Sequence, residues 1–158
     1  MQNIRVVKLD YIHFVTCFKF GVWGAKQNRL KNWDVGETVI FKVENEIAAI
    51  AKTSGSPFTS EDMIWDDDIY PYRLPIEFIY VVSKADRSKV SEKINKLLLD
   101  FLGTKYGWFF LTQKPLPTSL GEKIVNIILD SSNELSQFRA LVDKEYSVTQ
   151  SKIQNIEG

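Results

Sequence analysis

The feature that most constrains the fold is a β-hairpin in the first third of the chain. Thr38–Val43 is rich in β-branched and aromatic residues, which favour strands. Glu44-Asn45-Glu46 follows as the predicted turn, and Ile47–Lys52 returns as a second strand. The hairpin therefore predicts a sheet with antiparallel pairing, around which the rest of the chain has to pack.

Other segments of the first half extend this sheet or connect its strands. Tyr11–Cys17 alternates in a way that suits a strand. Tyr72–Val82 predicts another, in which Pro75 indicates an edge position or a bulge. Lys26–Trp33 has two apolar residues spaced as one helical face, so we expect a short helix there. Thr53–Asp68 is rich in Ser, Thr, Gly and Pro and predicts a long loop.

The second half of the chain is helical in pattern. Helices are predicted over Ser88–Leu102, over Thr118–Leu129 and over Asn133–Tyr146, with a short aromatic strand at Trp108–Leu111. Strands and helices do not alternate regularly, so a doubly wound parallel sheet is disfavoured. We expect an α+β fold: a small, curved, mixed β-barrel with peripheral helices. One domain should cover residues 1–146, and residues 147–158 should form a polar tail or the start of a linker.

Composition excludes several classes of protein. The chain has 158 residues, of which 44% are hydrophobic, which is enough for a core. A single cysteine, Cys17, and a single histidine, His13, exclude an internal disulfide and a Cys- or multi-His-based metal centre. The sequence contains neither a membrane-length apolar run nor the motifs of common cofactor sites. We therefore expect a cytoplasmic protein with no metal, no cofactor and no membrane partner.

The charge balance limits how nucleic acid would be bound. The 20 basic residues equal the 20 acidic ones, whereas proteins that grip phosphates alone are usually basic. A nucleic-acid ligand would need a local basic patch together with a pocket.

Aromatic residues in polar surroundings supply a candidate pocket. Trp23 stands between Gly21 and Gly24, which let a backbone approach a ligand closely. Trp65 lies within the polar loop, and Tyr70 follows it closely. Two indoles and a phenol near one sheet predict an aromatic cage that stacks on an unpaired base. The alternative is that the rings only fill the ends of the barrel.

An acidic run follows the second of these tryptophans. Asp66, Asp67 and Asp68 admit three interpretations: a cation site, acceptors for the exocyclic amine of a base, or a solvated turn.

Basic residues flank the first tryptophan. Lys19, Lys26, Arg29 and Lys31 form the best candidate for a phosphate-contacting patch, with a solvated helix face as the alternative. Arg73 is a further candidate for phosphate contact, or for an ion pair with the acidic run.

One pair of residues has the types needed for nucleophilic chemistry. His13 and Cys17 are four residues apart and should share a face, which makes a Cys–His dyad conceivable. The alternative is a buried cysteine that packs beside the imidazole.

Taken in order, these segments resemble the EVE domain, a member of the PUA-like superfamily and a relative of the YTH readers. The resemblance covers about residues 11–120. The matching boxes are Phe20-Gly21-Val22-Trp23-Gly24, Asn28-Arg29-Leu30, Val35–Phe41, Ile64-Trp65, Tyr70-Pro71-Tyr72-Arg73 and Trp108–Gln113 with Pro115.

The resemblance implies a reader that is not itself an enzyme. Such a domain binds nucleic acid with one base, often a modified one, flipped into a pocket. It implies that Trp23 and Trp65 form the cage, with Tyr70 lining it. Modified DNA is the expected ligand, since EVE-like domains precede the GTP-hydrolysing motor of McrB-type modification-dependent restriction enzymes. A C-terminal GTPase motor is thus a candidate partner.

Two alternatives stay open. In the first, the fold is the same but the ligand is RNA, and contacts to the 2′-hydroxyl would distinguish RNA from DNA. The second is a small hydrolase of modified nucleosides, which some PUA-like relatives are, with Lys52, Thr53 and either Glu61 or Glu77 in the active site.

Overall fold

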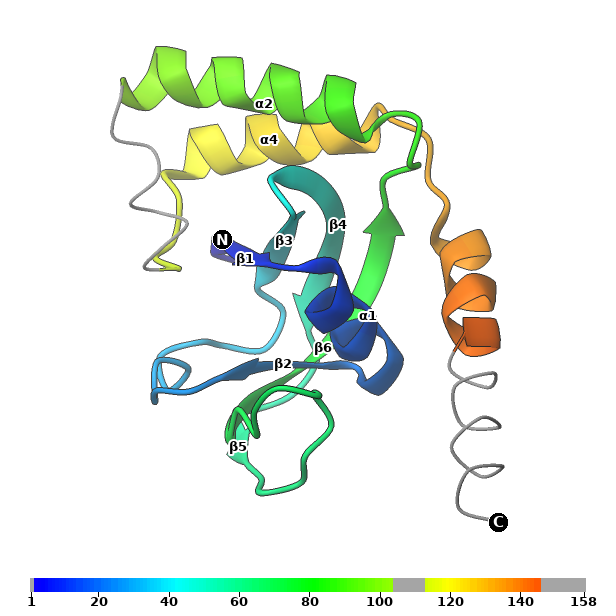
Figure 1. Cartoon of the computed structure of the whole chain (residues 1–158). Coiled ribbons are helices and arrows are strands. Elements are labelled where there is room, and N and C mark those ends of the chain that lie inside the picture. The colour runs from blue at the N-terminus through cyan, green and yellow to red at the C-terminus, as the bar shows by residue number, and fades with distance from the viewer. Residues whose placement is uncertain (1, 104–112, 146–158) are drawn as a thin grey trace.

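The computed structural model describes residues 2–103 and 113–145, and within them a curled sheet flanked by helices (Figure 1). The strands are β1 (Ile4–Leu9), β2 (Val22–Ala25), β3 (Thr38–Val43), β4 (Glu46–Thr53), β5 (Phe58–Thr59) and β6 (Tyr72–Val81). The helices are α1 (Tyr11–Phe20), α2 (Arg87–Leu102), α4 (Thr118–Leu129) and a further helix over 135–145. The predicted α+β class is confirmed.

The sheet is mixed, and it curls into a half-barrel (Figure 1). The strand order is β1-β3-β4-β6-β2, with β5 paired to β6, and only β1 and β3 run parallel. Two register shifts leave Ala48 of β4 and Ile79 of β6 as extra residues and mark bulges, which increase the twist of a sheet. The hairpin turn is Glu44-Asn45, both with positive φ, and Glu46 already belongs to β4.

The sequence-based prediction of a strand over Tyr11–Cys17 is wrong, because this segment is helix α1. The Asp10 side chain caps its start by accepting from the backbone N–H of His13 at 2.8 Å. Gly21, with φ of 65°, ends it in the left-handed conformation and donates its N–H to the Cys17 carbonyl. The first strand is instead β1, whose pairing with β3 sequence reasoning missed.

Two further expectations need correction. Lys26–Trp33 forms no helix: it is an irregular loop, in which burial of Leu30 and Trp33 over one turn mimics a helical stripe. β6 is not an edge strand, since it lies between β4 and β2. Pro75 fits there because it lies one residue beyond the last β4–β6 pair, where its missing N–H interrupts no ladder bond.

The predicted C-terminal helices are confirmed within one or two residues, and α2 and α4 lie side by side over one face of the sheet (Figure 1). The helix over 135–145 packs on the other face, where the ring of Phe138 contacts those of Phe14 and Phe18. The predicted strand at 108–111 and the predicted tail at 147–158 lie outside the described residues. No helix among the described residues is long and apolar enough to cross a bilayer.

Candidate functional site

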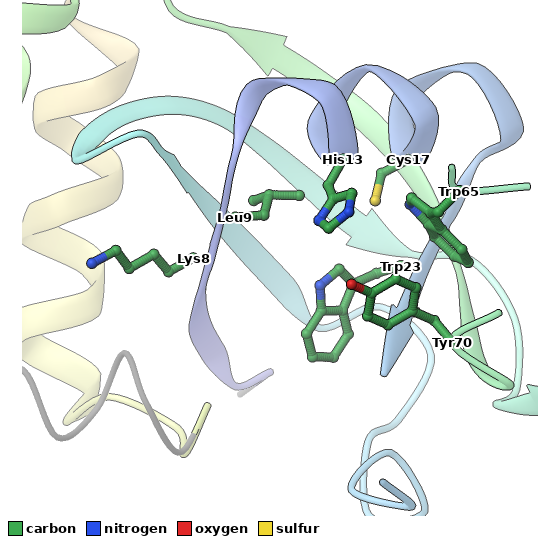
Figure 2. Close-up of a pocket in the computed structure, with 8 residues that line it drawn as sticks. Lys8, Leu9, His13, Cys17, Trp23, Trp65 and Tyr70 are labelled. Atoms are coloured by element: carbon green, nitrogen blue, oxygen red, sulfur yellow. The ribbon is translucent and has the colours of Figure 1, made fainter. Parts of the chain in front are cut away.

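A hollow of about 210 Å³ opens where β2, the start of α1 and the loop before β6 meet (Figure 2). This volume lies below the roughly 300 Å³ at which pockets for drug-sized ligands begin, so it suits a single small ring system. We call this hollow the cage. Its lining residues are Lys8, Leu9, His13, Cys17, Trp23, Gly24, Trp65 and Tyr70.

The three aromatic residues predicted for a base-binding site line this one hollow. Trp65 and Tyr70 meet edge to face, with ring centroids 5.2 Å apart and an interplanar angle of 74°. Trp23 faces the same hollow from β2 (Figure 2). Tyr70 has a φ of 48°, a conformation that costs free energy in a non-glycine residue and often occurs at functional sites. Two segments far apart in the sequence, β2 and the loop before β6, thus place their rings around one space.

Gly24 has a packing role at the cage. A Cβ atom built on Gly24 would lie 2.4 Å from the ring carbon Cη2 of Trp65 and 2.9 Å from Cβ of Tyr70. Any side chain at this position would therefore displace the rings. The glycine in the tryptophan box lets the indole of Trp65 lie directly against the β2 backbone.

A fourth aromatic residue, which sequence reasoning assigned only to a helix face, supports the cage from behind. Trp33 stacks on Trp23 with a centroid distance of 5.4 Å and an interplanar angle of 21°. The guanidinium of Arg5 lies over the Trp33 ring, 4.5 Å from its centroid. Trp23 is therefore held in a layered stack rather than left to rotate freely.

The Arg5 guanidinium is fixed by a buried carboxylate. Nε of Arg5 lies 2.9 Å from Oε2 of Glu37, and Nδ2 of Asn3 donates to Oε1 of Glu37 at 2.9 Å. The Glu37 side chain is fully buried, so this ion pair is shielded from solvent. No motif in the sequence signals the pair, because its members lie in separate segments that meet only through the β1–β3 pairing.

The acidic run contributes one polar contact at the cage rim. Oδ1 of Asp67 hydrogen-bonds Nε2 of His13 at 2.8 Å, and Oδ2 accepts from the Tyr70 hydroxyl at 2.8 Å. The bond from Tyr70, and then that to His13, holds the pKa of Asp67 below its usual range. Burial and, next, the Asp67 carboxylate raise the pKa of Tyr70, so the phenol keeps its proton.

The other two acidic residues are placed differently. Asp66 is exposed, and it lies close enough to His13 and Asp67 for one ligand atom of each to share an ion, but this candidate cation site is empty. Asp68 pairs with Lys26 at 3.3 Å. Lys26 also lies over the Tyr70 ring at 5.4 Å, which puts its ammonium at the rim of the cage.

The remaining basic candidates do not gather at the cage. Lys19 pairs with Asp143 at 3.1 Å, and Arg29 bonds to the side chain of Gln27. Arg73 is buried: its guanidinium donates to the carbonyls of Asp62, Ile69 and Tyr70 and lies 5.3 Å from the Trp65 ring centroid. These hydrogen bonds hold the loop that carries Trp65 in place. The predicted contact of Arg73 with phosphate stays a prediction.

Neither predicted set of catalytic residues has an activated nucleophile. Cys17 and His13 both line the cage, as their spacing predicted, but on a helix rather than a strand. Burial raises the pKa of Cys17 to about 12, so the thiol stays neutral. The Thr53 hydroxyl is buried and donates to the Asp34 carbonyl at 2.5 Å, while Lys52 Nζ donates to Thr38 at 2.8 Å.

Comparison with known proteins places the fold. No protein-family model matches the chain, and no curated protein sequence matches it either. Solved structures do. The chain has the fold of YTH domains.

Two YTH domains and one further solved structure illustrate the match. The YTH domain of the Zygosaccharomyces rouxii MRB1 protein, solved in complex with N6-methyladenosine RNA, has a TM-score of 0.56 at 16% identity, over 85% of this chain and 91% of that one. The Toxoplasma CPSF4-YTH domain in its apo form gives 0.53 at 10%, over 87% and 93%. Rpa0253 from Rhodopseudomonas palustris gives 0.52 at 14%, over 84% and 97%. The predicted likeness to YTH domains is confirmed for the fold alone.

Proposed function

We propose that this chain is a non-catalytic reader that binds nucleic acid by holding one methylated base in the cage. The observation that carries the proposal is the convergence of Trp23 from β2 with Trp65 and Tyr70 from the loop before β6 on one hollow of about 210 Å³. A flat base stacks on such rings with about 1–3 kcal/mol for each ring. A methyl group adds only about 1 kcal/mol through its apolar area, so polar contacts must contribute to discrimination.

Asp67 and its neighbours supply such contacts at the rim. A carboxylate has about four acceptor sites, of which two are used by His13 and Tyr70. Asp67 therefore keeps capacity for the exocyclic N–H of N6-methyladenine or of 5-methylcytosine. Lys26, whose ammonium lies at the same rim, is the candidate for contact with a flanking phosphate.

We further propose that the ligand is modified DNA and that the chain acts within a McrB-type restriction system, together with its GTPase motor. Its support is the resemblance of the boxes around Trp23 and Trp65 to EVE domains. RNA is the second candidate, and a specific observation favours it: one structural neighbour, the MRB1 YTH domain, was solved in complex with N6-methyladenosine RNA.

The test is fluorescence anisotropy with labelled DNA and RNA strands of one sequence at one salt concentration. Each is prepared unmodified, with N6-methyladenine and with 5-methylcytosine, and the DNA also as a duplex. We expect a reader to prefer one modification by about tenfold, since the buried methyl group adds about 1 kcal/mol and polar contacts at the rim add to the discrimination. Equal binding of all strands would show that the aromatic residues are only core and would overturn the proposal.

A further inference from the structure

A second hollow lies near the cage, beyond β2. Its volume is about 300 Å³, larger than that of the cage. Its walls come from the loop after β2 and from the segments around β5 and β6, with Asn28, Lys31, Pro57, Phe58 and Tyr72 among the lining residues.

The β2–β6 pair and the loop after β2 both extend from the cage to the second hollow. Tyr72 pairs with Ala25 of β2, and two residues further along β6 Leu74 pairs with Trp23 of the cage. Two strand residues span about 7 Å, a step that one sugar–phosphate link can bridge. The loop after β2 begins with Lys26, at the cage rim, and reaches the second hollow at Lys31.

The lining of the second hollow has the chemistry of a nucleotide site. The Phe58 side chain is 42% exposed although it is large and apolar, and Tyr72 beside it is half-buried. Lys31 is exposed and has no ion-pair partner in the described part of the chain. Aromatic faces that stack on bases, next to a cation that contacts phosphate, are how single strands are bound without regard to sequence.

Charge gives the bound strand a direction. The loop after β2 carries Lys26, Arg29 and Lys31, whereas the loop between β5 and β6 carries an exposed acidic stretch that includes Glu61, Asp62, Asp66 and Asp67. A phosphate backbone is attracted along the first loop and repelled by the second. Stacking of the neighbouring base on exposed rings requires that this base be unpaired, which favours a single strand over a duplex.

From these observations we infer that the ligand is single-stranded at the site, and that the nucleotide next to the modified one occupies the second hollow. Its base stacks on Phe58 and Tyr72, and its phosphate contacts Lys31. This inference rests on the proposed reading of a modified base in the cage.

The first test separates the two hollows by ligand size. Binding of N6-methyladenosine alone, and of a short single strand with one N6-methyladenine in RNA and in DNA form, is measured for the parent and for Phe58→Ala. We expect Phe58→Ala to weaken strand binding about fivefold or more and to leave nucleoside binding unchanged. The matched control is Phe101→Ala, which removes an equally exposed ring (44%) on α2 and should change neither.

The second test uses salt. Each phosphate contact to a single strand contributes about 0.7 to the slope of log K against log salt concentration. Lys31→Ala should reduce the slope by about this amount, whereas Lys96→Ala, which removes an exposed lysine on α2, should leave it unchanged.

The outcomes distinguish this inference from the function on which it rests. Equal affinity of the parent for modified and unmodified strands would contradict the reader function. If the parent prefers the modified strand but Phe58→Ala binds that strand as tightly as the parent does, the inference about the second hollow is wrong and the reader function stands. The same conclusion follows if the parent prefers the modified base but binds a duplex as tightly as a single strand.

Discussion

The two faces of the curled sheet carry different kinds of core. One face packs aliphatic side chains against α2 and α4, and its buried members include Val6, Ile40, Ile50, Ile94, Leu98, Leu120, Ile124 and Ile128. The other face packs rings, and its members include Phe14, Phe18, Trp33, Phe41, Trp65, Phe78 and Phe138. The first is covered by α2 and α4 (Figure 1), while α1 and the helix over 135–145 pack on the second, which ends in the cage.

The difference shows how one sheet combines stability with binding. Aliphatic residues under two helices bury apolar area without directional demands. The aromatic face must also hold rings at fixed angles around an open space. It does so with directional contacts: the Arg5–Glu37 pair behind Trp33, and the bonds of Asp67 to His13 and Tyr70 at the rim.

The largest expected effect is on the aromatic face. Glu37→Ala leaves Arg5 buried beside Trp33 without its carboxylate, which should lower the free energy of unfolding by about 3–5 kcal/mol. Urea denaturation measures this, and Glu46→Ala, at the start of β4, is a control expected to change it little. A Glu37→Ala variant as stable as the parent would mean that the pair does not support this face.

Leu98→Ala probes the aliphatic face. Leu98 is fully buried in α2, and its truncation should cost about 2–5 kcal/mol of stability. Its neighbour Leu99 is 51% exposed, so Leu99→Ala should stay within about 0.5 kcal/mol of the parent. Folded Leu98→Ala should bind the ligand as the parent does. If folded Leu98→Ala lost its binding of the modified base, the aliphatic face would not serve stability alone.

Gly24→Ala tests the fit of the cage itself. The new methyl group would collide with the Trp65 ring, so we expect a loss of about 1–3 kcal/mol of stability together with weaker ligand binding. Trp65→Phe removes the ring atoms closest to the new methyl group but leaves Cβ of Tyr70, so it should recover part of the stability in the double variant without restoring affinity. A double-mutant cycle by urea denaturation measures this coupling, and additive effects would show that the two positions do not meet.

The smallest effect concerns Cys17. Because burial raises the pKa of Cys17 to about 12, from 9.0, its contribution to stability is complete below pH 9 and is lost only as the pH rises towards 12. Between pH 7 and 9 a thiol reagent should therefore react slowly with the folded chain and rapidly in urea. Fast labelling of the folded protein at pH 8 would contradict this and would show that the reagent reaches the Cys17 thiol through the cage.

Sequence reasoning identified what depends on composition and local pattern. The hairpin, β6, the helices α2 and α4 and the aromatic residues of the cage all carry signals in neighbouring residues. The rings of Trp23, Trp65 and Tyr70 stood out because they occur among glycines and polar residues, although the structure buries Trp65 in the core.

The errors arose where tertiary contacts decide. α1 is rich in aromatic and β-branched residues, so its local preference favours a strand, although Asp10 and Gly21 carried the cap signals of a helix. Burial of Leu30 and Trp33 by the barrel imitated a helical stripe. The stack of Trp33 on Trp23 depends on tertiary packing, so no pattern among neighbouring residues predicts it.

The measurement that tests the central claim most directly is the affinity ratio between methylated and unmethylated strands, compared for the parent and for Trp23→Ala. Trp23 is half-buried on a short strand, so the variant should fold, which circular dichroism verifies. We predict a ratio near one for Trp23→Ala and an unchanged ratio for the control Phe101→Ala. A Trp23→Ala variant that folds and keeps the parent's preference for the methylated strand would contradict the cage.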